Sequence, residues 1–88
     1  MKPSEVSGRP VLVANVGGRH FVFTRNCPHE GADLAEGELL ERQVICNNHG
    51  YRFDVATGEC ILPGADCPNL TVLPVVEREG EVCVRITW

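Results

Sequence analysis

The chain has 88 residues, of which 43% are hydrophobic and 23% are charged, and its formal net charge is −4. This length predicts a single domain with a thin core, and the composition is that of an ordered globular protein rather than a disordered one. The acidic charge argues against nucleic acid as a partner, because phosphate neutralisation needs clustered Lys and Arg. No apolar run reaches the roughly 18 residues of a membrane span, and no apolar signal core follows Met1. We therefore expect a cytoplasmic protein that does not enter the membrane.

The first predicted elements are two strands joined by a tight turn. A polar N-terminal segment, residues 1–10, precedes a β-rich run over residues 11–16. Gly17-Gly18 then leads into a second β-rich run over residues 19–24, which predicts a hairpin. Residues 30–41 contain two glycines and five acidic side chains, namely Glu30, Asp33, Glu36, Glu38 and Glu41. This stretch is expected to be an acidic connection with little regular structure.

The second half of the chain continues with short strands and turns. Residues 39–46 show imperfect alternation and predict one strand, and residues 51–55 with 60–62 predict a second hairpin. Residues 63–68 form a proline-bounded loop, and residues 70–77 with 81–87 predict a third hairpin. No segment shows sustained 3.6-residue periodicity. The predicted fold class is therefore all-β, built from small antiparallel sheets.

Two short motifs each place a cysteine beside a histidine, as Cys27-x-His29 and Cys46-x-x-His49. Each motif follows a predicted strand and lies among turn-forming residues, where functional ligands are common. Two sulfur and two nitrogen donors predict a metal site, either tetrahedral zinc or a two-iron, two-sulfide cluster. Structural zinc sites usually pair Cys with Cys and His with His. Both pairs are mixed here, which favours a binuclear centre.

At these four residues the chain resembles the Rieske iron–sulfur family, whose pattern is Cys-x-His followed further along by Cys-x-x-His-Gly. The resemblance implies a single Rieske domain over residues 11–88, with small stacked antiparallel sheets and one [2Fe–2S] cluster held between two loops at one end. It also implies that Cys27 and Cys46 bind one iron, whereas His29 and His49 bind the outer iron near solvent.

Four neighbouring positions indicate the branch of the family. Ala32 and Asn48 stand where Rieske proteins of respiratory and photosynthetic complexes carry disulfide-bonded cysteines, and Tyr51 and Phe53 replace their hydroxyl donors to sulfur. Fewer donors predict a potential near the low end of the roughly −150 to +300 mV Rieske range. The chain is thus similar to soluble Rieske ferredoxins of bacterial ring-hydroxylating oxygenase systems. That similarity implies a flavin-dependent reductase as donor and a terminal oxygenase as acceptor.

The resemblance implies a one-electron carrier rather than an enzyme. The chain shows no nucleophile and base pairing, no nucleotide-binding glycine motif and no second set of iron ligands. Two alternatives stay open. One is a small Rieske-like subunit of an assimilatory nitrite reductase, and the other, from a different class, is a zinc-dependent interaction module.

The remaining cysteines and histidine receive no functional role from the sequence. Cys60, Cys67 and Cys83 are expected to be ordinary small residues, and a Cys60–Cys67 disulfide is the less favoured interpretation in a reducing compartment. His20 is expected to lie on a strand surface. Rieske ferredoxins generally have a further strand before the first hairpin, and only ten residues precede residue 11. We therefore expect either a reduced fold or an edge covered by a partner or a second copy, and the oligomeric state stays open.

Overall fold

The computed structural model describes residues 1–29, 31–64 and 66–86, and in them the regular structure is almost entirely β. The elements are β1 (Lys2–Val6), β2 (Arg9–Val16), β3 (Arg19–Thr24), a 3₁₀ helix (Leu34–Glu36), β4 (Glu38–Leu40), β5 (Gln43–Ile45), β6 (Arg52–Asp54), β7 (Cys60–Leu62), β8 (Val72–Leu73), β9 (Val75–Arg78) and β10 (Glu81–Val84). They form three antiparallel sheets, with strand orders β1-β2-β3-β8, β4-β5-β6-β7 and β10-β9. The predicted fold class is confirmed. No helix in these residues has the length and apolar character needed to cross a membrane.

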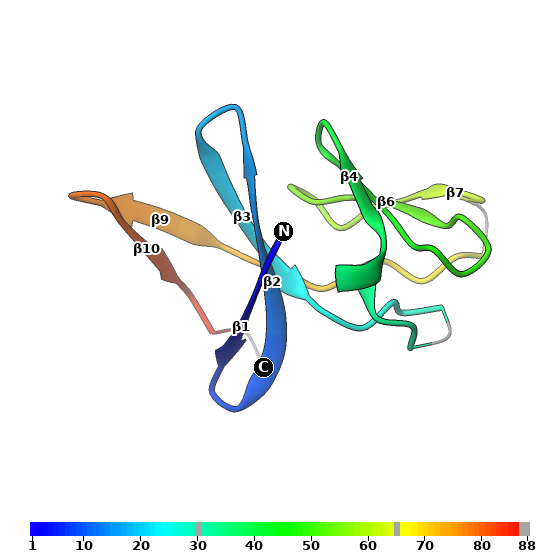
Figure 1. Ribbon diagram of the computed structural model, residues 1–88, viewed down its shortest axis with the longest axis horizontal. Helices are drawn as coiled ribbons and strands as arrows, with labels where there is room; N and C mark the ends of the chain where they lie inside the picture. Colours follow the sequence, from blue (N-terminus) through cyan, green and yellow to red (C-terminus); the bar gives the residue numbers. More distant parts are fainter. Residues whose placement is uncertain (30, 65, 87–88) are drawn as a thin grey trace.

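The three sheets lie on two sides of the molecule (Figure 1). The β1-β2-β3-β8 sheet and the β9–β10 hairpin lie on one side, and the β4-β5-β6-β7 sheet lies on the other. The loop after β3 and the loop between β5 and β6 both lie on the β4–β7 side, far from the β9–β10 hairpin (Figure 1). The β1-β2-β3-β8 sheet therefore acts as the scaffold, and the loops that carry the Cys and His motifs meet at the opposite end of the molecule.

The first predicted hairpin is confirmed. Strands β2 and β3 pair from Val16 opposite Arg19 to Val11 opposite Thr24. Gly17 and Gly18 connect them with φ angles of 59° and 88°. A two-residue connection with both φ values positive matches the right-handed twist of the flanking strands, and glycine adopts it at little steric cost.

The N-terminal segment differs from the expectation of a polar stretch before the sheet. Its residues Lys2–Val6 form β1, which pairs antiparallel with β2 from Lys2 opposite Val13 to Val6 opposite Arg9. The extra strand thus lies within the first ten residues. Sequence patterning missed it because β1 is an edge strand whose side chains are almost all exposed, and it contains Pro3, which an edge tolerates.

The third predicted hairpin is present, but its first strand is divided. Pro74 separates β8, which pairs with β3, from β9, which pairs with β10. Cross-strand partners Val75 and Val84 pack against a small buried cluster of Val11, Val22 and Leu73. The predicted end of this hairpin at residue 87 falls outside the described residues.

The connection between the two Cys and His motifs contains more regular structure than expected. Asp33 caps the 3₁₀ helix, whose Leu34 is fully buried, and the helix leads directly into β4. The expected single strand over residues 39–46 is instead the β4–β5 hairpin, turned at Glu41, which has a φ of 54°. Of the five acidic residues predicted in the connection, Glu30 lies outside the described residues.

The main core connects the scaffold to the loops. Phe23 from β3 and Phe53 from β6 are fully buried in one cluster, which also contains Cys27 and Cys46. Because both cysteines lie within this core, the positions of their sulfur atoms are set by packing as well as by the loops that carry them.

Candidate metal centre

The first ligand loop leaves β3 and closes on itself around Cys27. The Cys27 N–H donates to the Ala32 carbonyl at 2.7 Å, and the Gly31 N–H donates to the Cys27 carbonyl at 2.7 Å. Gly31 has a φ of 73°, a left-handed conformation that suits glycine. This loop buries Cys27, which is 2% exposed, and leaves His29 half-buried.

An ion pair holds the two ends of the first loop together. The Arg25 Nε and Nη2 atoms donate to the two carboxylate oxygens of Asp33, each at 2.8 Å. Asp33 Oδ1 also accepts the Ala35 N–H at 2.9 Å. The Arg25 hydrogen bond, followed by that from Ala35, lowers the pKa of Asp33 from 3.8 to about 2. A bidentate pair of this kind fixes geometry as well as charge.

The second ligand loop follows β5 and is a tight turn. The Cys46 N–H donates to the Tyr51 carbonyl at 2.8 Å, and the Asn48 N–H points at the Cys46 sulfur, 3.4 Å away. His49 and Gly50 both have a φ of 68°. A positive φ is unusual for histidine, and such backbone conformations gather at functional sites. The turn buries Cys46, which is 1% exposed, and leaves His49 exposed.

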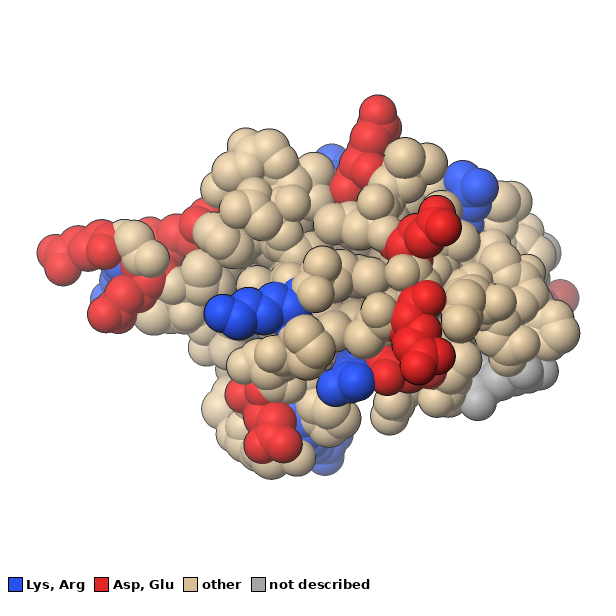
Figure 2. Space-filling view, in the orientation of Figure 1, with Lys and Arg blue, Asp and Glu red and all other residues tan. Residues whose placement is uncertain are grey.

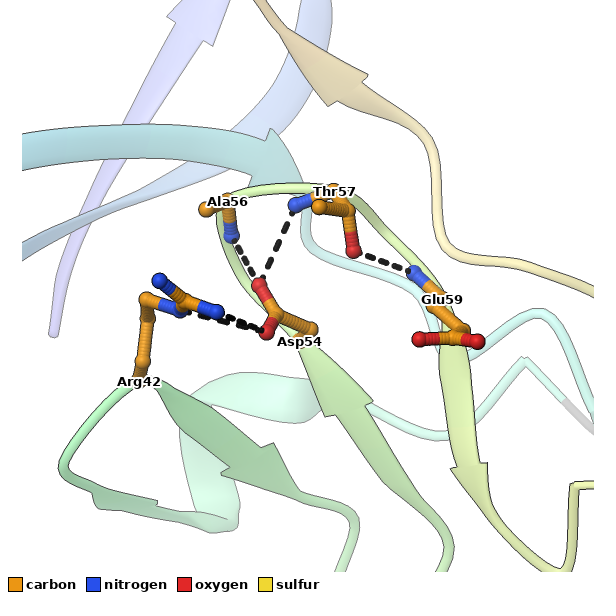
Figure 3. A network of polar contacts seen from close by, with 5 residues as sticks. All are labelled: Arg42, Asp54, Ala56, Thr57 and Glu59. Atoms are coloured by element: carbon orange, nitrogen blue, oxygen red, sulfur yellow. Dashed lines mark hydrogen bonds and ion pairs between the residues drawn. The ribbon is translucent and has the colours of Figure 1, made fainter.

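Asp54, at the end of β6 away from the second ligand loop, connects the turn after β6 to Arg42 in the turn before β5 (Figure 3). Its Oδ1 accepts the Ala56 and Thr57 N–H groups at 2.8 and 3.1 Å, and its Oδ2 accepts Arg42 Nε and Nη2 at 3.2 and 3.0 Å. Burial by itself raises the pKa of Asp54, but the hydrogen bonds from Ala56, Thr57 and Arg42 together lower it more. The net pKa is lowered, so the network favours the charged carboxylate.

A disulfide bond joins Cys60 and Cys67 across the proline loop, with their Cα atoms 5.9 Å apart. This corrects the expectation that both are ordinary unpaired residues. The loop over residues 63–68 reverses the chain, which brings Cys67 back to β7, and Asn69 Oδ1 accepts the Cys60 N–H at 3.1 Å. Residue spacing alone did not show that reversal. Cys83 is a free and exposed thiol, as expected of a residue with no ligand role.

The structure brings the predicted ligands from the two loops together. The rings of His29 and His49 lie 5.9 Å apart between centroids, at an interplanar angle of 78°. Cys27 and Cys46 share the buried core cluster, so the sulfur atoms lie inside and the imidazoles lie further out. His20 does not join them. Its Nδ1 lies 2.6 Å from Glu77 Oε1 on β9, which places it on the scaffold as a surface residue.

This donor set fits a two-iron cluster. One zinc ion would require four donors that converge on a single point. Within the described ranges, no group of three or more His, Cys, Asp or Glu side chains is gathered closely enough to hold one metal ion. Two buried sulfurs and two outer imidazoles match a binuclear centre in which one iron takes both cysteines and the other both histidines.

Tyr51 has a role at the site that sequence patterning did not assign. Its ring stacks on the His29 imidazole, with centroids 3.9 Å apart and an interplanar angle of 15°. In the sequence, Tyr51 stood out only because Rieske proteins of respiratory and photosynthetic complexes carry a hydroxyl donor to sulfur at the matching position. The sequence does show an aromatic residue directly after the His49-Gly50 turn. It could not show the stack on His29, because that contact forms only when the fold brings the two loops together.

Acidic side chains cluster on the visible face (Figure 2). They gather over the β4 region and at the tip of the β9–β10 hairpin, whereas Lys and Arg side chains lie singly. Glu36, Glu38 and Glu41 are exposed in the segment that connects the two ligand loops. The charge near the loops is therefore predominantly negative.

Comparison with known proteins identifies relatives that match most of the chain. The family model described as Rieske [2Fe-2S] domain matches residues 1–77. The chain is 33% identical over 87 residues to chlorophyllide a oxygenase of Chlamydomonas reinhardtii. This match covers 93% of the chain but only 13% of the oxygenase. It is also 33% identical over 81 residues to the ferredoxin component of the alkene monooxygenase system of Xanthobacter autotrophicus, covering 91% of the chain and 65% of that protein.

A solved structure shares the fold closely. The complex of reduced oxygenase and oxidized ferredoxin in carbazole 1,9a-dioxygenase contains a chain that superposes with a TM-score of 0.82 at 32% sequence identity. The match covers 96% of this chain and 86% of that one. The two-sided β arrangement described above is thus a known fold.

Proposed function

Because the chain belongs to the Rieske [2Fe-2S] domain family, we propose that it carries single electrons through a cluster held by Cys27, Cys46, His29 and His49. The observation that supports these ligands is their placement, with two buried sulfurs in one core cluster and two imidazoles 5.9 Å apart on neighbouring loops. The proposed domain spans residues 11–88, with β1 of the preceding segment completing its sheet. The proposed role is that of a carrier rather than an enzyme.

The bound [2Fe–2S] group would supply reversible one-electron chemistry. The protein tunes that chemistry through its ligands and their neighbours. Two neutral imidazoles in place of two thiolates remove negative charge and raise the potential above the roughly −400 mV of an all-cysteine plant-type centre. The phenyl ring of Phe53, which has no hydroxyl group to donate to a cluster sulfur, acts in the opposite direction and lowers the potential. We infer a potential near the low end of the Rieske range.

The proposed acceptor is a terminal oxygenase and the proposed donor is a flavin-dependent reductase. Support for the acceptor comes from two relatives, one named as the ferredoxin component of a monooxygenase system and one solved together with an oxygenase. Exposed His49 offers the route by which an electron reaches a docked protein, because its imidazole is the more accessible of the two. Both exchanges are proposed to take place in the cytoplasm.

The alternatives are less well supported. A small subunit of assimilatory nitrite reductase would not need all four ligands, whereas this chain retains them in two ordered loops. One relative is named as the ferredoxin component of a monooxygenase system, which supports the carrier. A zinc interaction module would need ligands that converge on one ion.

The experiment that tests this function is a redox titration followed by electron paramagnetic resonance (EPR) on protein purified without oxygen. We expect a red-brown protein that binds two irons per chain and gives a Rieske-type signal only when reduced. A midpoint below zero supports the ferredoxin role. A midpoint well above zero overturns that role, and a colourless protein with no signal overturns cluster binding in favour of zinc.

A second measurement tests the partner. The exposed acidic segment with Glu36, Glu38 and Glu41 would attract a basic docking surface, and that attraction would weaken as salt screens it. We expect the rate of electron transfer to a ring-hydroxylating oxygenase to fall as ionic strength rises. A rate that does not change with ionic strength would exclude electrostatic steering by this segment.

A further inference from the structure

Tyr51 connects the two ligand loops. Its backbone carbonyl accepts the Cys46 N–H at 2.8 Å, which closes the second loop. Its side chain reaches the first loop, where the phenol ring stacks on His29 at 3.9 Å between centroids and 15° between planes. One residue therefore fixes the backbone of one loop and covers an imidazole of the other.

The stack supplies an orientation that the histidine side chain does not have by itself. The terminal torsion of a histidine is broad, so rotamer preference alone leaves the ring plane poorly defined. His29 is half-buried in a short loop, and the parallel ring of Tyr51 restricts its rotation on one face. On another side the ring of His49 meets it edge-on, at 78°. The plane of the His29 imidazole is therefore set by aromatic contacts from the second loop.

The same contact has an electrostatic consequence. The face of an aromatic ring is negative and attracts positive charge placed over it. An imidazole bound to a metal centre donates electron density, and it is more positive when that centre is oxidised. A phenol ring over His29 therefore stabilises the oxidised state more than the reduced state. This effect lowers the reduction potential.

We propose that Tyr51 is a positioning residue for His29, which fixes the plane of the imidazole and lowers the reduction potential through its ring face. The inference rests on the proposed ligand role of His29. It concerns the ring rather than the hydroxyl group, because the stack is a contact between ring faces. Tyr51 thus contributes to the site through its aromatic surface.

The test compares the wild type with three variants at position 51 and one control variant at position 21. Tyr51→Phe keeps the stack and removes the hydroxyl group. Tyr51→pentafluorophenylalanine keeps the shape and reverses the charge of the ring face, and Tyr51→Leu removes the stack. Phe21→Leu is the matched control, since Phe21 packs against the main core from β3, outside the ligand loops. The readouts are the midpoint potential and the ¹⁴N couplings of the histidine ligands from pulsed EPR.

We expect Tyr51→Phe to match the wild type in potential and couplings, and the fluorinated variant to show a higher potential with the same couplings. Tyr51→Leu should raise the potential and broaden the couplings, whereas Phe21→Leu should leave both unchanged. If Tyr51→Leu does not hold iron, the inference is tested by the difference in midpoint potential between Tyr51→Phe and Tyr51→pentafluorophenylalanine, because their side chains have the same shape.

Two results would overturn the inference. One is an unchanged potential between Tyr51→Phe and its fluorinated form. The other is a Tyr51→Phe variant that already shifts the potential as far as Tyr51→Leu, which would assign the effect to the hydroxyl group. Both can occur while the wild type gives a normal Rieske signal, and the proposed function then stands. A wild type with no such signal overturns both.

Discussion

The backbone of Gly58 lies directly against the backbone of Leu70. The Leu70 N–H donates to the Gly58 carbonyl at 2.7 Å, and a Cβ atom on Gly58 would overlap the Leu70 carbonyl oxygen. This contact attaches the turn after β6 to the segment that follows the proline loop.

We expect Gly58→Ala to destabilise the protein by more than its φ angle alone explains. Gly80, in the β9–β10 turn, is a matched control because both glycines have a φ of 82° but a Cβ atom on Gly80 meets nothing within 4 Å. Gly80→Ala should cost about 1 kcal/mol from the left-handed conformation. Gly58→Ala should cost about 1–3 kcal/mol more, as overpacking does. Urea unfolding of both variants measures this, and equal losses would contradict the close approach.

Replacing a ligand should remove the iron. Cys46→Ala deletes a buried sulfur that the structure places among the core residues, so we expect almost complete loss of iron and of visible absorption. Cys83→Ala is the control, since Cys83 is exposed on β10. The iron-to-protein ratio of both variants, purified in parallel, is the measurement. Retention of iron by Cys46→Ala would show that the assigned ligand set is wrong.

Loss of the Asp54 carboxylate charge should weaken the network that connects Arg42 to the turn after β6. Asp54→Asn keeps the size of the side chain but replaces one acceptor oxygen by an amide, so Arg42 or the Ala56 and Thr57 N–H groups lose a partner. We expect a loss of about 1–3 kcal/mol in the free energy of unfolding. Asp66→Asn, at an exposed position, should change it little. Chemical unfolding compares them, and equal values for the two variants would exclude a stabilising network.

The Arg25–Asp33 pair should make stability depend on acid pH. The pKa of Asp33 falls from 3.8 to about 2 in the folded protein, so the unfolded chain takes up a proton first as the pH falls. The contribution is complete above about pH 5 and is lost progressively as the pH drops toward about 2. The urea midpoints of wild type and Asp33→Asn should therefore differ at neutral pH and converge as the pH falls to about 2. The urea midpoint of the control Glu38→Gln, on exposed β4, should change with pH in parallel with that of the wild type. A difference in urea midpoint between wild type and Asp33→Asn that stays the same at every pH would refute the linkage.

The disulfide should be detectable and stabilising. Denatured protein should show two fewer reactive thiols before reduction than after it, because Cys60 and Cys67 are joined. The bond closes a short loop with a sequence separation of 7, for which chain entropy gives about 2–3 kcal/mol. Cys60→Ser with Cys67→Ser should lower the unfolding free energy by that amount. An unchanged thiol count on reduction would contradict the pairing.

The sequence was sufficient where local chemistry decides the structure. Gly17-Gly18 between two β-rich runs predicted the first hairpin, and the mixed Cys and His motifs predicted which side chains approach one another. The structure places His29 beside His49 and buries both cysteines. The ligand assignment itself stays a prediction until iron binding is tested.

The sequence was insufficient where distant contacts decide. Strand β1 has an exposed polar pattern and takes its conformation from pairing with β2. The disulfide depends on the reversal of the proline loop, and the Tyr51 stack depends on two loops meeting. None of these contacts has a local signature. Spacing of residues along the chain could not predict them.

The distribution of the five cysteines has a practical consequence for labelling chemistry. Two are the proposed iron ligands and two form the disulfide, which leaves Cys83, exposed on β10, as the one thiol open to maleimide or gold. The β9–β10 hairpin lies on the far side of the molecule from the ligand loops (Figure 1). A fluorophore, a spin label or an electrode surface joined at Cys83 would thus leave the electron-exchanging end facing outward.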